Sequence, residues 1–203
     1  MADRPGGQAV SGMNLFGRDR VRLSEADALA ELCDDLYRAA YQPGDVVLDS
    51  GISQPYFIDK YLMVARPAIL RRLSRFLARM IPPEVERIAA PTLGAVALGA
   101  AVSLEAGLPL AIVRTHWDDS RRGHPVEGGI RRGETVALVE DVVVSGSRAL
   151  QAVERLRESG AQVDTVLCVL DCERGAADLL TSKTIRLTSL FRYSSFTSSR
   201  DTS

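Results

Sequence analysis

The residues with the clearest chemical potential form one segment, in which an apolar strand predicted at 135–139 ends in the acidic pair Glu140 and Asp141. A turn of small residues follows and opens a predicted helix over 147–158; it consists of Val144, Ser145, Gly146 and Ser147. Backbone N–H groups and hydroxyls at a helix N-terminus bind anions such as phosphate. Adjacent carboxylates can accept hydrogen bonds from the vicinal hydroxyls of a sugar. The segment therefore predicts a site for a ribose 5-phosphate group at the carboxyl edge of a sheet, where open parallel sheets bind ligands.

A simpler interpretation of the same segment is a strand end with solvated acids and an ordinary helix cap at Ser145 or Ser147. The order of the residues favours the sugar phosphate, because the acids precede the small residues as such a ligand requires. The loop is poor in glycine and no lysine follows Gly146, which sets aside both the dinucleotide-binding fingerprint and the P-loop.

Composition narrows the class of protein. The chain has 203 residues, of which 46% are hydrophobic, and a formal net charge of -1. This balance suits a globular domain and gives no reason to expect a nucleic-acid or membrane-surface partner. No apolar run reaches the roughly 18 residues of a membrane span. No apolar run follows Arg4, as a secretory signal would require, so we expect a cytoplasmic protein. Cys33, Cys168 and Cys172 form no paired set and have no metal-ligand spacing, so we expect free thiols and no zinc site.

The elements that must position the acidic segment alternate along the chain. Helices are expected from Ser24 and Pro67 and over 95–105, 147–158 and 176–181, and strands over 45–49, 56–62, 85–90, 110–113, 135–139, 163–170 and 185–190. Continuous apolar runs flanked by helices are typical of a parallel sheet covered on both faces, so we expect an α/β fold with a doubly wound parallel sheet. Residues 1–20 and 194–203 lack periodicity, which predicts a mobile tail and a frayed tail around a single domain over 21–193.

The acidic segment resembles the phosphoribosyl pyrophosphate (PRPP) motif of type I phosphoribosyltransferases, and residues 25–190 resemble the orotate phosphoribosyltransferase branch. Three further stretches carry the likeness: Ser50-Gly51 with Pro55-Tyr56-Phe57-Ile58-Asp59 is similar to the hood, Ala90-Pro91-Thr92-Leu93-Gly94-Ala95 to the pyrophosphate loop, and Glu127-Gly128 to the pair that closes the mobile catalytic loop. The resemblance implies the type I phosphoribosyltransferase fold, with a small N-terminal hood over 24–65 and a core over 66–193.

The resemblance also implies a reaction of pyrimidine biosynthesis, in which PRPP gives its ribose 5-phosphate to a ring nitrogen of an acceptor base and pyrophosphate leaves. Glu140 and the catalytic Asp141 would hold the ribose hydroxyls, and residues 144–147 the 5-phosphate. Pyrophosphate would meet Thr92, Leu93, Gly94 and Arg114. Mg2+ would be bound mainly by PRPP and water, without a direct protein ligand. A homodimer that shares the 114–133 loop is expected.

The catalytic loop departs from the family pattern. The branch reads Arg-Lys-Glu-x-Lys-x-His-Gly, whereas residues 114–121 read Arg-Thr-His-Trp-Asp-Asp-Ser-Arg, so that Arg114 matches while both lysines and the histidine are replaced. Cations beside pyrophosphate stabilise the leaving group, so other residues must substitute for the lysines. The candidates are His116, Arg121, Arg122 and His124, of which the histidines could also act as general bases. The alternative is a solvated surface loop with inert charges.

The acceptor pocket departs as well. The lysine that lies near the orotate ring in the branch falls on Ser53, and the arginine that pairs the orotate carboxylate falls on Cys172. Acceptor contacts are expected from Ser53, Tyr56, Phe57, Lys60, Cys172 and Arg174, although Lys60 could instead pair with a surface acid. Because a buried carboxylate without a cation is costly, three hypotheses stay open. They are transfer to orotate, transfer to a different base or ring acid, and a catalytically silent PRPP-binding regulator.

Overall fold

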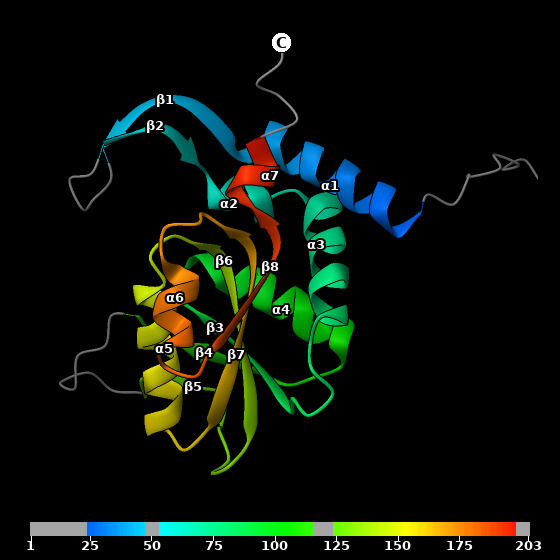
Figure 1. The fold of residues 1–203 in the computed structure, drawn as a ribbon. Coiled ribbons are helices and arrows are strands. Elements are labelled where there is room, and N and C mark those ends of the chain that lie inside the picture. Colours follow the sequence, from blue (N-terminus) through cyan, green and yellow to red (C-terminus); the bar gives the residue numbers. More distant parts are fainter. Residues whose placement is uncertain (1–23, 48–52, 116–123, 198–203) are drawn as a thin grey trace, which may run out of the picture.

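The computed structural model describes residues 24–47, 53–115 and 124–197 (Figure 1). Its N-terminal part consists of α1 (Glu25–Ala40), the antiparallel hairpin β1 (Tyr41–Val47) and β2 (Ser53–Ile58), and α2 (Lys60–Val64). Ser24 caps α1 by accepting the N–H of Asp27. Asp59 caps α2, because its Oδ1 accepts the N–H groups of Tyr61 and Leu62. Both helices therefore begin where a side chain satisfies free backbone donors.

Two predicted boundaries in this part are wrong. The strand expected at 45–49 begins at Tyr41, directly after α1, and its pairing with β2 has an irregularity between Pro43 and Val46. The strand expected at 56–62 ends at Ile58. The reason is the cap at Asp59, which starts a helix in a sequence whose apolar residues suit either conformation.

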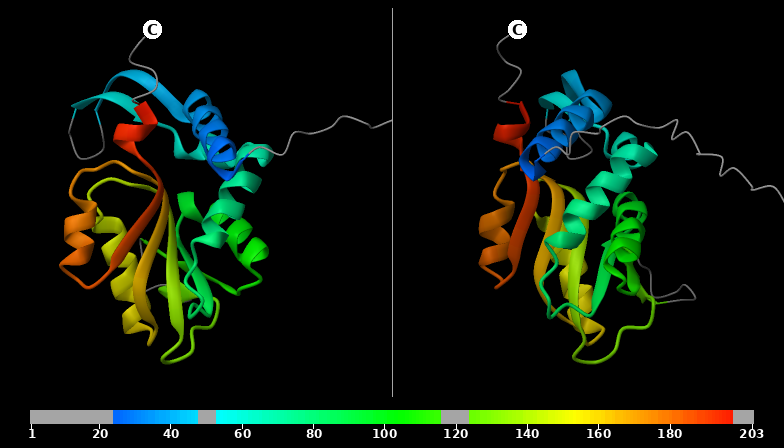
Figure 2. Two further views of the ribbon diagram at one scale, coloured as in Figure 1. Left: turned by 45° about the vertical axis from the view of Figure 1, so that its right-hand side comes forward. Right: turned by 90° about the vertical axis from the view of Figure 1, so that its right-hand side faces the viewer.

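The remaining elements form a six-stranded sheet and its covering helices. They are α3 (Pro67–Arg79), β3 (Arg87–Pro91), α4 (Gly94–Ala106), β4 (Leu110–Val113), β5 (Val126–Glu127), β6 (Thr135–Val143), α5 (Ser147–Glu158), β7 (Gln162–Asp171), α6 (Ala176–Thr181), β8 (Arg186–Arg192) and α7 (Tyr193–Thr197). The strand order is β5-β4-β3-β6-β7-β8, parallel except for β5. Helices α3 and α4 cover one face, and α5 and α6 the other (Figures 1 and 2). The predicted α/β fold is confirmed.

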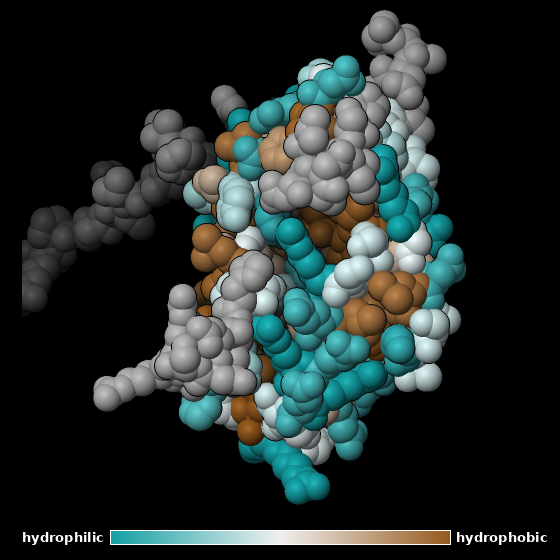
Figure 3. All heavy atoms as spheres, turned by 90° about the vertical axis from the view of Figure 1, so that its left-hand side faces the viewer, coloured by the Kyte–Doolittle hydropathy of each residue, from teal (hydrophilic) through white to brown (hydrophobic). Residues whose placement is uncertain are grey.

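The packing of the central strand β6 explains why residues 136–139 form a continuous apolar run. Ala137 and Val139 pack into the cluster under α3 and α4, whereas Val136 and Leu138 pack into the cluster under α5. Successive side chains of a strand point to opposite faces, so burial on both faces requires apolar residues throughout. On the outer surface over α5 and α6, hydrophilic side chains predominate (Figure 3). None of the helices in the described ranges is long and apolar enough to cross a bilayer.

Three other features of the core differ from the prediction. Strand β6 continues to Val143 rather than ending at 139, so the acidic pair lies inside the strand and pairs with β7. The polar stretch 114–133 contains the short strand β5, which pairs antiparallel with β4. Residues 193–197, expected to belong largely to the frayed tail, form α7, in which Phe196 is fully buried. Helix α7 could not be predicted from the sequence, because one phenylalanine among serines and threonines does not establish a periodic pattern.

Replacement of Phe196 by alanine tests whether α7 belongs to the fold. Phe196 has no exposed surface and lies 5.4 Å from the ring of Tyr37 in α1. We expect the substitution to lower the free energy of unfolding by about 3 kcal/mol, a value at the low end for a buried phenylalanine because a terminal helix can undock locally. Urea titration gives the measurement. An unchanged unfolding midpoint would mean that the tail is frayed, as the sequence predicted.

Candidate active site

The acidic pair occupies the carboxyl-terminal half of β6, beneath the hood hairpin and α2. Glu140 is 7% exposed and Asp141 is 1% exposed. Asp141 Oδ1 accepts the N–H of Val142 at 2.7 Å. Asp141 Oδ2 is buried and has no hydrogen bond within the described part of the chain. A buried carboxylate oxygen without a donor is energetically costly, and it offers an acceptor for a ligand hydroxyl.

Lys60 supplies the cation beside this oxygen. It is the first residue of α2, and its Nζ lies 3.5 Å from Asp141 Oδ2, with 31% of its side chain exposed. The same ammonium lies 5.7 Å from the centre of the Tyr61 ring. The interpretation of Lys60 as the partner of a surface acid is therefore wrong, because Asp141 is buried. A contact between Lys60 and the acceptor stays a prediction.

Gly94 brings the N-terminus of α4 against the same pair. A Cβ atom at this position would overlap the Asp141 carboxylate and would lie 2.8 Å from Lys60 Nζ. Only glycine lets the helix start approach this closely. The preceding peptide bond, Thr92–Leu93, is cis, and Leu93 is 73% exposed. Thr92 Oγ1 accepts the N–H of Thr115 at 3.2 Å, which connects the loop between β3 and α4 to the end of β4. The predicted pyrophosphate loop thus borders the acidic pair.

The turn that follows β6 exposes hydroxyls at the start of α5. Ser145 and Ser147 are exposed, and their Oγ atoms lie 3.1 Å apart. Gly146 between them has a φ of 80° and is buried against Ala176, whose Cα would lie 3.1 Å from an added Cβ. Val144 is 40% exposed. The turn therefore presents hydroxyls and the free N–H groups of a twelve-residue helix to solvent, as an anion site requires.

Burial dominates the electrostatics of Glu140. It raises the pKa of this carboxyl to about 8, and the neighbouring charge of Asp141 acts in the same direction. Lys60 and Arg148 act in the opposite direction. Removing a charge from water disfavours the ionised form, which explains the sign. At neutral pH the ligand-free site therefore favours a protonated Glu140, and a bound cation or hydroxyl donors would favour its ionisation.

This pKa shift predicts how stability depends on pH. Because the pKa of Glu140 is raised from 4.5 to about 8, its contribution to stability is full below about pH 4.5 and is lost as the pH rises towards about 8. Relative to Glu140→Gln, the wild type should lose about 1.4 kcal/mol per pH unit within this window. Urea titrations of both proteins across the window measure the difference. Parallel pH profiles would show that Glu140 is ionised throughout.

The described ends of the predicted catalytic loop, residues 114–133, are bonded to each other. Arg114 at the end of β4 lies 3.2 Å from Glu127 Oε1, and the N–H of His124 donates to the same oxygen. The His124 hydrogen bond is the main cause that lowers the pKa of the exposed Glu127, and Arg114 adds to it. Gly128 is held by Arg87, whose Nη1 donates to its carbonyl at 2.8 Å. Three predicted loop residues lie outside the described ranges: His116, Arg121 and Arg122.

On the acceptor side, the residues have unequal access. Tyr56 is only 4% exposed, and its ring stacks with those of Tyr41 and Tyr193 at 5.8 and 4.6 Å. Cys172 is also buried, and burial raises the pKa of its thiol to about 12, so that it offers a neutral group. Phe57 is half-buried and Arg174 is exposed. The side chain of Ser53 lies outside the described part. These acceptor contacts stay predictions.

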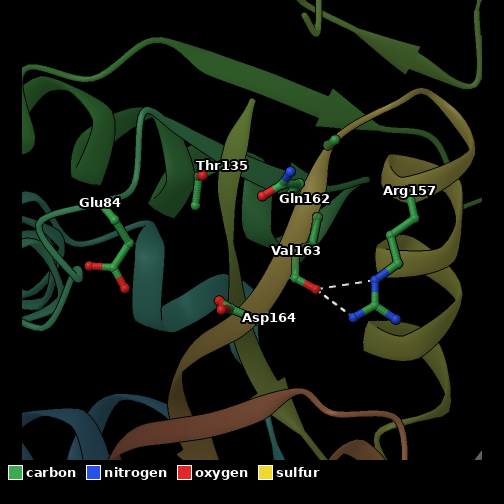
Figure 4. A pocket seen from close by; sticks show the side chains of 7 residues that line it. Glu84, Thr135, Arg157, Gln162, Val163 and Asp164 are labelled. Carbon is green, nitrogen blue, oxygen red and sulfur yellow. Dashed lines mark hydrogen bonds between the residues drawn. The ribbon is translucent and has the colours of Figure 1, made fainter. Parts of the chain in front are cut away.

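A depression of about 520 Å³ lies at the other edge of the sheet (Figure 4). It is lined by Glu84, Thr135, Arg157, Ala161, Gln162, Val163 and Asp164, around the amino ends of β6 and β7. The guanidinium of Arg157 points to the carbonyl of Val163 and donates to it at 2.6 and 3.1 Å, so it is already bonded within the fold. The depression is separate from the acidic pair, and none of the predicted site residues lines it.

The fold and the acidic strand–turn–helix together define a type I phosphoribosyltransferase. The structure is similar to orotate phosphoribosyltransferase from Mycobacterium tuberculosis H37Rv, with a TM-score of 0.73 and 24% identity over 83% of this chain and 98% of that chain. It is also similar to the enzyme of the same name from Aeropyrum pernix, with a TM-score of 0.69 and 27% identity over 83% and 97% of the two chains. No family model matches the sequence.

Curated relatives define the family more closely. The chain is 38% identical over 161 residues to orotate phosphoribosyltransferase of Natronomonas pharaonis, which covers 79% of this chain and 92% of the relative. It is 39% identical over 155 residues to that of Methanoculleus marisnigri, covering 76% and 89% of the two. To that of Methanocella arvoryzae it is 34% identical over 151 residues, covering 74% and 86%. The chain belongs to the orotate phosphoribosyltransferase family.

The contact among Lys60, Gly94 and Asp141 was not predicted as a unit. The pattern that could have indicated it is local, because Asp59 is a helix-capping residue type directly before Lys60. Recognition of that cap would have placed Lys60 on the first turn of a helix rather than within a strand. Its distance from the acidic pair could still not be read from the sequence, since the two positions are about 80 residues apart in the chain.

Proposed function

We propose that the chain is an orotate phosphoribosyltransferase, which transfers ribose 5-phosphate from PRPP to a ring nitrogen of orotate and releases pyrophosphate. Family membership supports this activity. The observation that carries it is the buried Asp141 Oδ2, an acceptor without a hydrogen-bond donor, which lies next to Glu140 and a few residues before an exposed hydroxyl turn. This order of groups matches the hydroxyls and terminal phosphate of ribose 5-phosphate.

The donor would be held by groups of opposite polarity at its two ends. Asp141 and Glu140 accept hydrogen bonds from the ribose hydroxyls, and these bonds to ionised acceptors are strong because the site excludes water. Residues 144–147 donate hydroxyl and backbone N–H groups to the 5-phosphate, assisted by the N-terminal end of α5. Gly146 permits the close approach of backbone to phosphate, since a side chain there would meet Ala176.

Departure of pyrophosphate needs stabilisation of its negative charge. The N-terminus of α4, a helix of 13 residues that begins at Gly94, presents its free N–H groups beside the loop that includes Thr92 and Leu93. Arg114 adds a guanidinium, which in the ligand-free structure lies beside Glu127. Positive groups fixed near the leaving oxygens lower the barrier because they need little reorganisation when charge develops. The anionic pair in β6 faces the ribosyl group, whose anomeric carbon becomes cationic.

We include Mg2+ as a companion of PRPP rather than as a resident metal. Among the described residues no group of three or more metal-ligating side chains could hold an ion alone. Mg2+ commonly keeps several waters and binds through substrate phosphates plus one or two carboxylates, and the carboxylates of Glu140 and Asp141 fit this description, with Asp141 Oδ2 also 3.5 Å from Lys60 Nζ. An ion held there by PRPP and these carboxylates would supply positive charge to the departing pyrophosphate.

The position of Cys172 favours a second candidate, transfer to a base that lacks the orotate carboxylate. Its thiol is buried and neutral, whereas a buried carboxylate requires a cation. For orotate, the cation must come from another residue, and the candidates are Arg174, two residues after Cys172, and Lys60 in α2. The curated relatives carry the name of a transferase for orotate, which favours orotate over this candidate and over a catalytically silent regulator.

We also propose a homodimer that shares the 114–133 loop.

One assay separates these functions. The protein is incubated with PRPP, Mg2+ and one acceptor from a panel of orotate, uracil and other ring acids, and pyrophosphate release is measured. Orotate-dependent release supports the proposal. Release with another acceptor alone supports the second candidate. PRPP binding measured by calorimetry, without turnover on any acceptor, supports the regulator and contradicts both transferases. Light scattering of the same sample determines whether the chain is a dimer.

A further inference from the structure

The loop that follows β7 is tied to the C-terminal helix. Glu173 Oε2 accepts the N–H of Ser194 at 2.8 Å, and the N–H of Glu173 donates to Asp171 Oδ1 at 2.9 Å. The N–H of Cys172 donates to the carbonyl of Val143, at the end of β6. The conformation of residues 171–173 is therefore fixed on one side by the sheet and on the other by α7.

The residue next to Ser194 contacts a different part of the molecule. The ring of Tyr193 stacks on that of Tyr56 in the hood hairpin, with 4.6 Å between centroids and 23° between planes. Tyr56 in turn stacks on Tyr41 of β1. Phe196, one turn later, is buried against Tyr37 of α1. The start of α7 thus joins the hood to the 171–175 loop through two adjacent residues, and α7 lies next to the hood in Figures 1 and 2.

The backbone of Glu173 also indicates that surrounding contacts impose the conformation of residues 171–173. Its φ is 55°, in the left-handed region that residues with a Cβ rarely adopt. Such a conformation persists where surrounding contacts determine it, and it often occurs at ligand sites. Here the contacts are the hydrogen bonds to Asp171 and Ser194. They orient the backbone of Cys172, the position that corresponds by resemblance to the carboxylate-binding arginine of the family.

We propose that Tyr193 and Glu173 are positioning residues for the acceptor, which together hold the 171–175 loop and the hood hairpin at the spacing that the acceptor requires. The inference rests on the proposed function. It assigns acceptor affinity rather than donor affinity to α7, because neither the stacking of Tyr193 on Tyr56 nor the Glu173–Ser194 hydrogen bond involves the donor groups. Asp141 is fixed by Val142 and Lys60, and Gly146 packs on Ala176 of α6.

The test compares disruptive with conservative variants of the full chain. Tyr193→Ala removes the stacking and Glu173→Gly removes the carboxylate while permitting the positive φ. We expect each to raise the KM for orotate about tenfold or more and to leave the Kd of PRPP within about twofold. Tyr193→Phe keeps the ring and Glu173→Gln keeps an acceptor oxygen, so both should retain nearly the wild-type KM. Thermal unfolding of all four variants monitors the fold.

A second measurement does not depend on activity. Hydrogen exchange of the backbone amides in residues 171–175 should accelerate in Tyr193→Ala and Glu173→Gly, and should remain slow in the two conservative variants. Unchanged exchange or an unchanged acceptor KM would overturn the inference. An equal loss of affinity for acceptor and donor would also overturn it, because a merely structural role of α7 predicts that result. Absence of orotate turnover in the wild type would instead contradict the proposed function. Hydrogen exchange would then still test whether α7 holds the 171–175 loop in place.

Discussion

Replacement of Asp141 by asparagine should weaken PRPP binding by about 100-fold or more and lower kcat/KM at least as much. The geometry decides which way the new amide points. Its nitrogen cannot take the place of Oδ1, because that atom accepts the Val142 N–H at 2.7 Å and two donors would then face each other. The nitrogen must replace Oδ2, where it lies beside the Lys60 ammonium and presents a donor instead of an acceptor to the ribose hydroxyl.

Calorimetric titration with PRPP and Mg2+ measures this loss. Asp164→Asn is the matched control, because Asp164 is exposed near the opposite edge of the sheet and an asparagine oxygen can still accept the hydroxyl of Thr165. That variant should bind PRPP as the wild type does. If Asp141→Asn also retained full affinity while unfolding at the wild-type temperature, the assignment of the acidic pair to ribose would be wrong.

The part of the site that could be predicted is contiguous in the chain. Glu140, Asp141 and the 144–147 turn lie in one strand–turn–helix unit, and local sequence largely determines such a unit. The structure differs from the predicted elements of this unit in the length of β6. Its last residues pair with β7 as far as Val143, and both acidic side chains are buried there rather than solvated at a strand end.

The elements that could not be predicted depend on contacts between distant segments. Strand β5 has two residues and exists through its pairing with β4. Helix α7 exists through the contacts of Tyr193 and Phe196, a single pair at i, i+3 that is too short to show a helical period in the sequence. Short elements have little intrinsic propensity of their own, so tertiary contacts decide them. The contact of α7 with both the hood and the 171–175 loop could not be predicted for the same reason.

Replacement of Gly94 by alanine should reduce kcat/KM by about 1,000-fold, with a smaller effect on stability. The new Cβ would overlap the Asp141 carboxylate and would lie 2.8 Å from Lys60 Nζ. Lys60 can move aside because 31% of its side chain is exposed. Asp141 has almost no exposed surface, so its carboxylate must rotate and lose the Val142 hydrogen bond. The ribose hydroxyls then lose their acceptor and the start of α4 moves away from pyrophosphate.

Gly99 provides the matched control on the same helix. Its added Cβ would lie 2.5 Å from the Cβ of Ala90 in the core, away from the acidic pair. Gly99→Ala should therefore lower the unfolding temperature, while the folded fraction keeps its kcat/KM. The two alanine variants thus separate loss of activity from loss of stability. Adding Lys60→Ala to Gly94→Ala should not restore activity, because it relieves only the ammonium contact; recovery would mean that Lys60, rather than Asp141, was the group displaced.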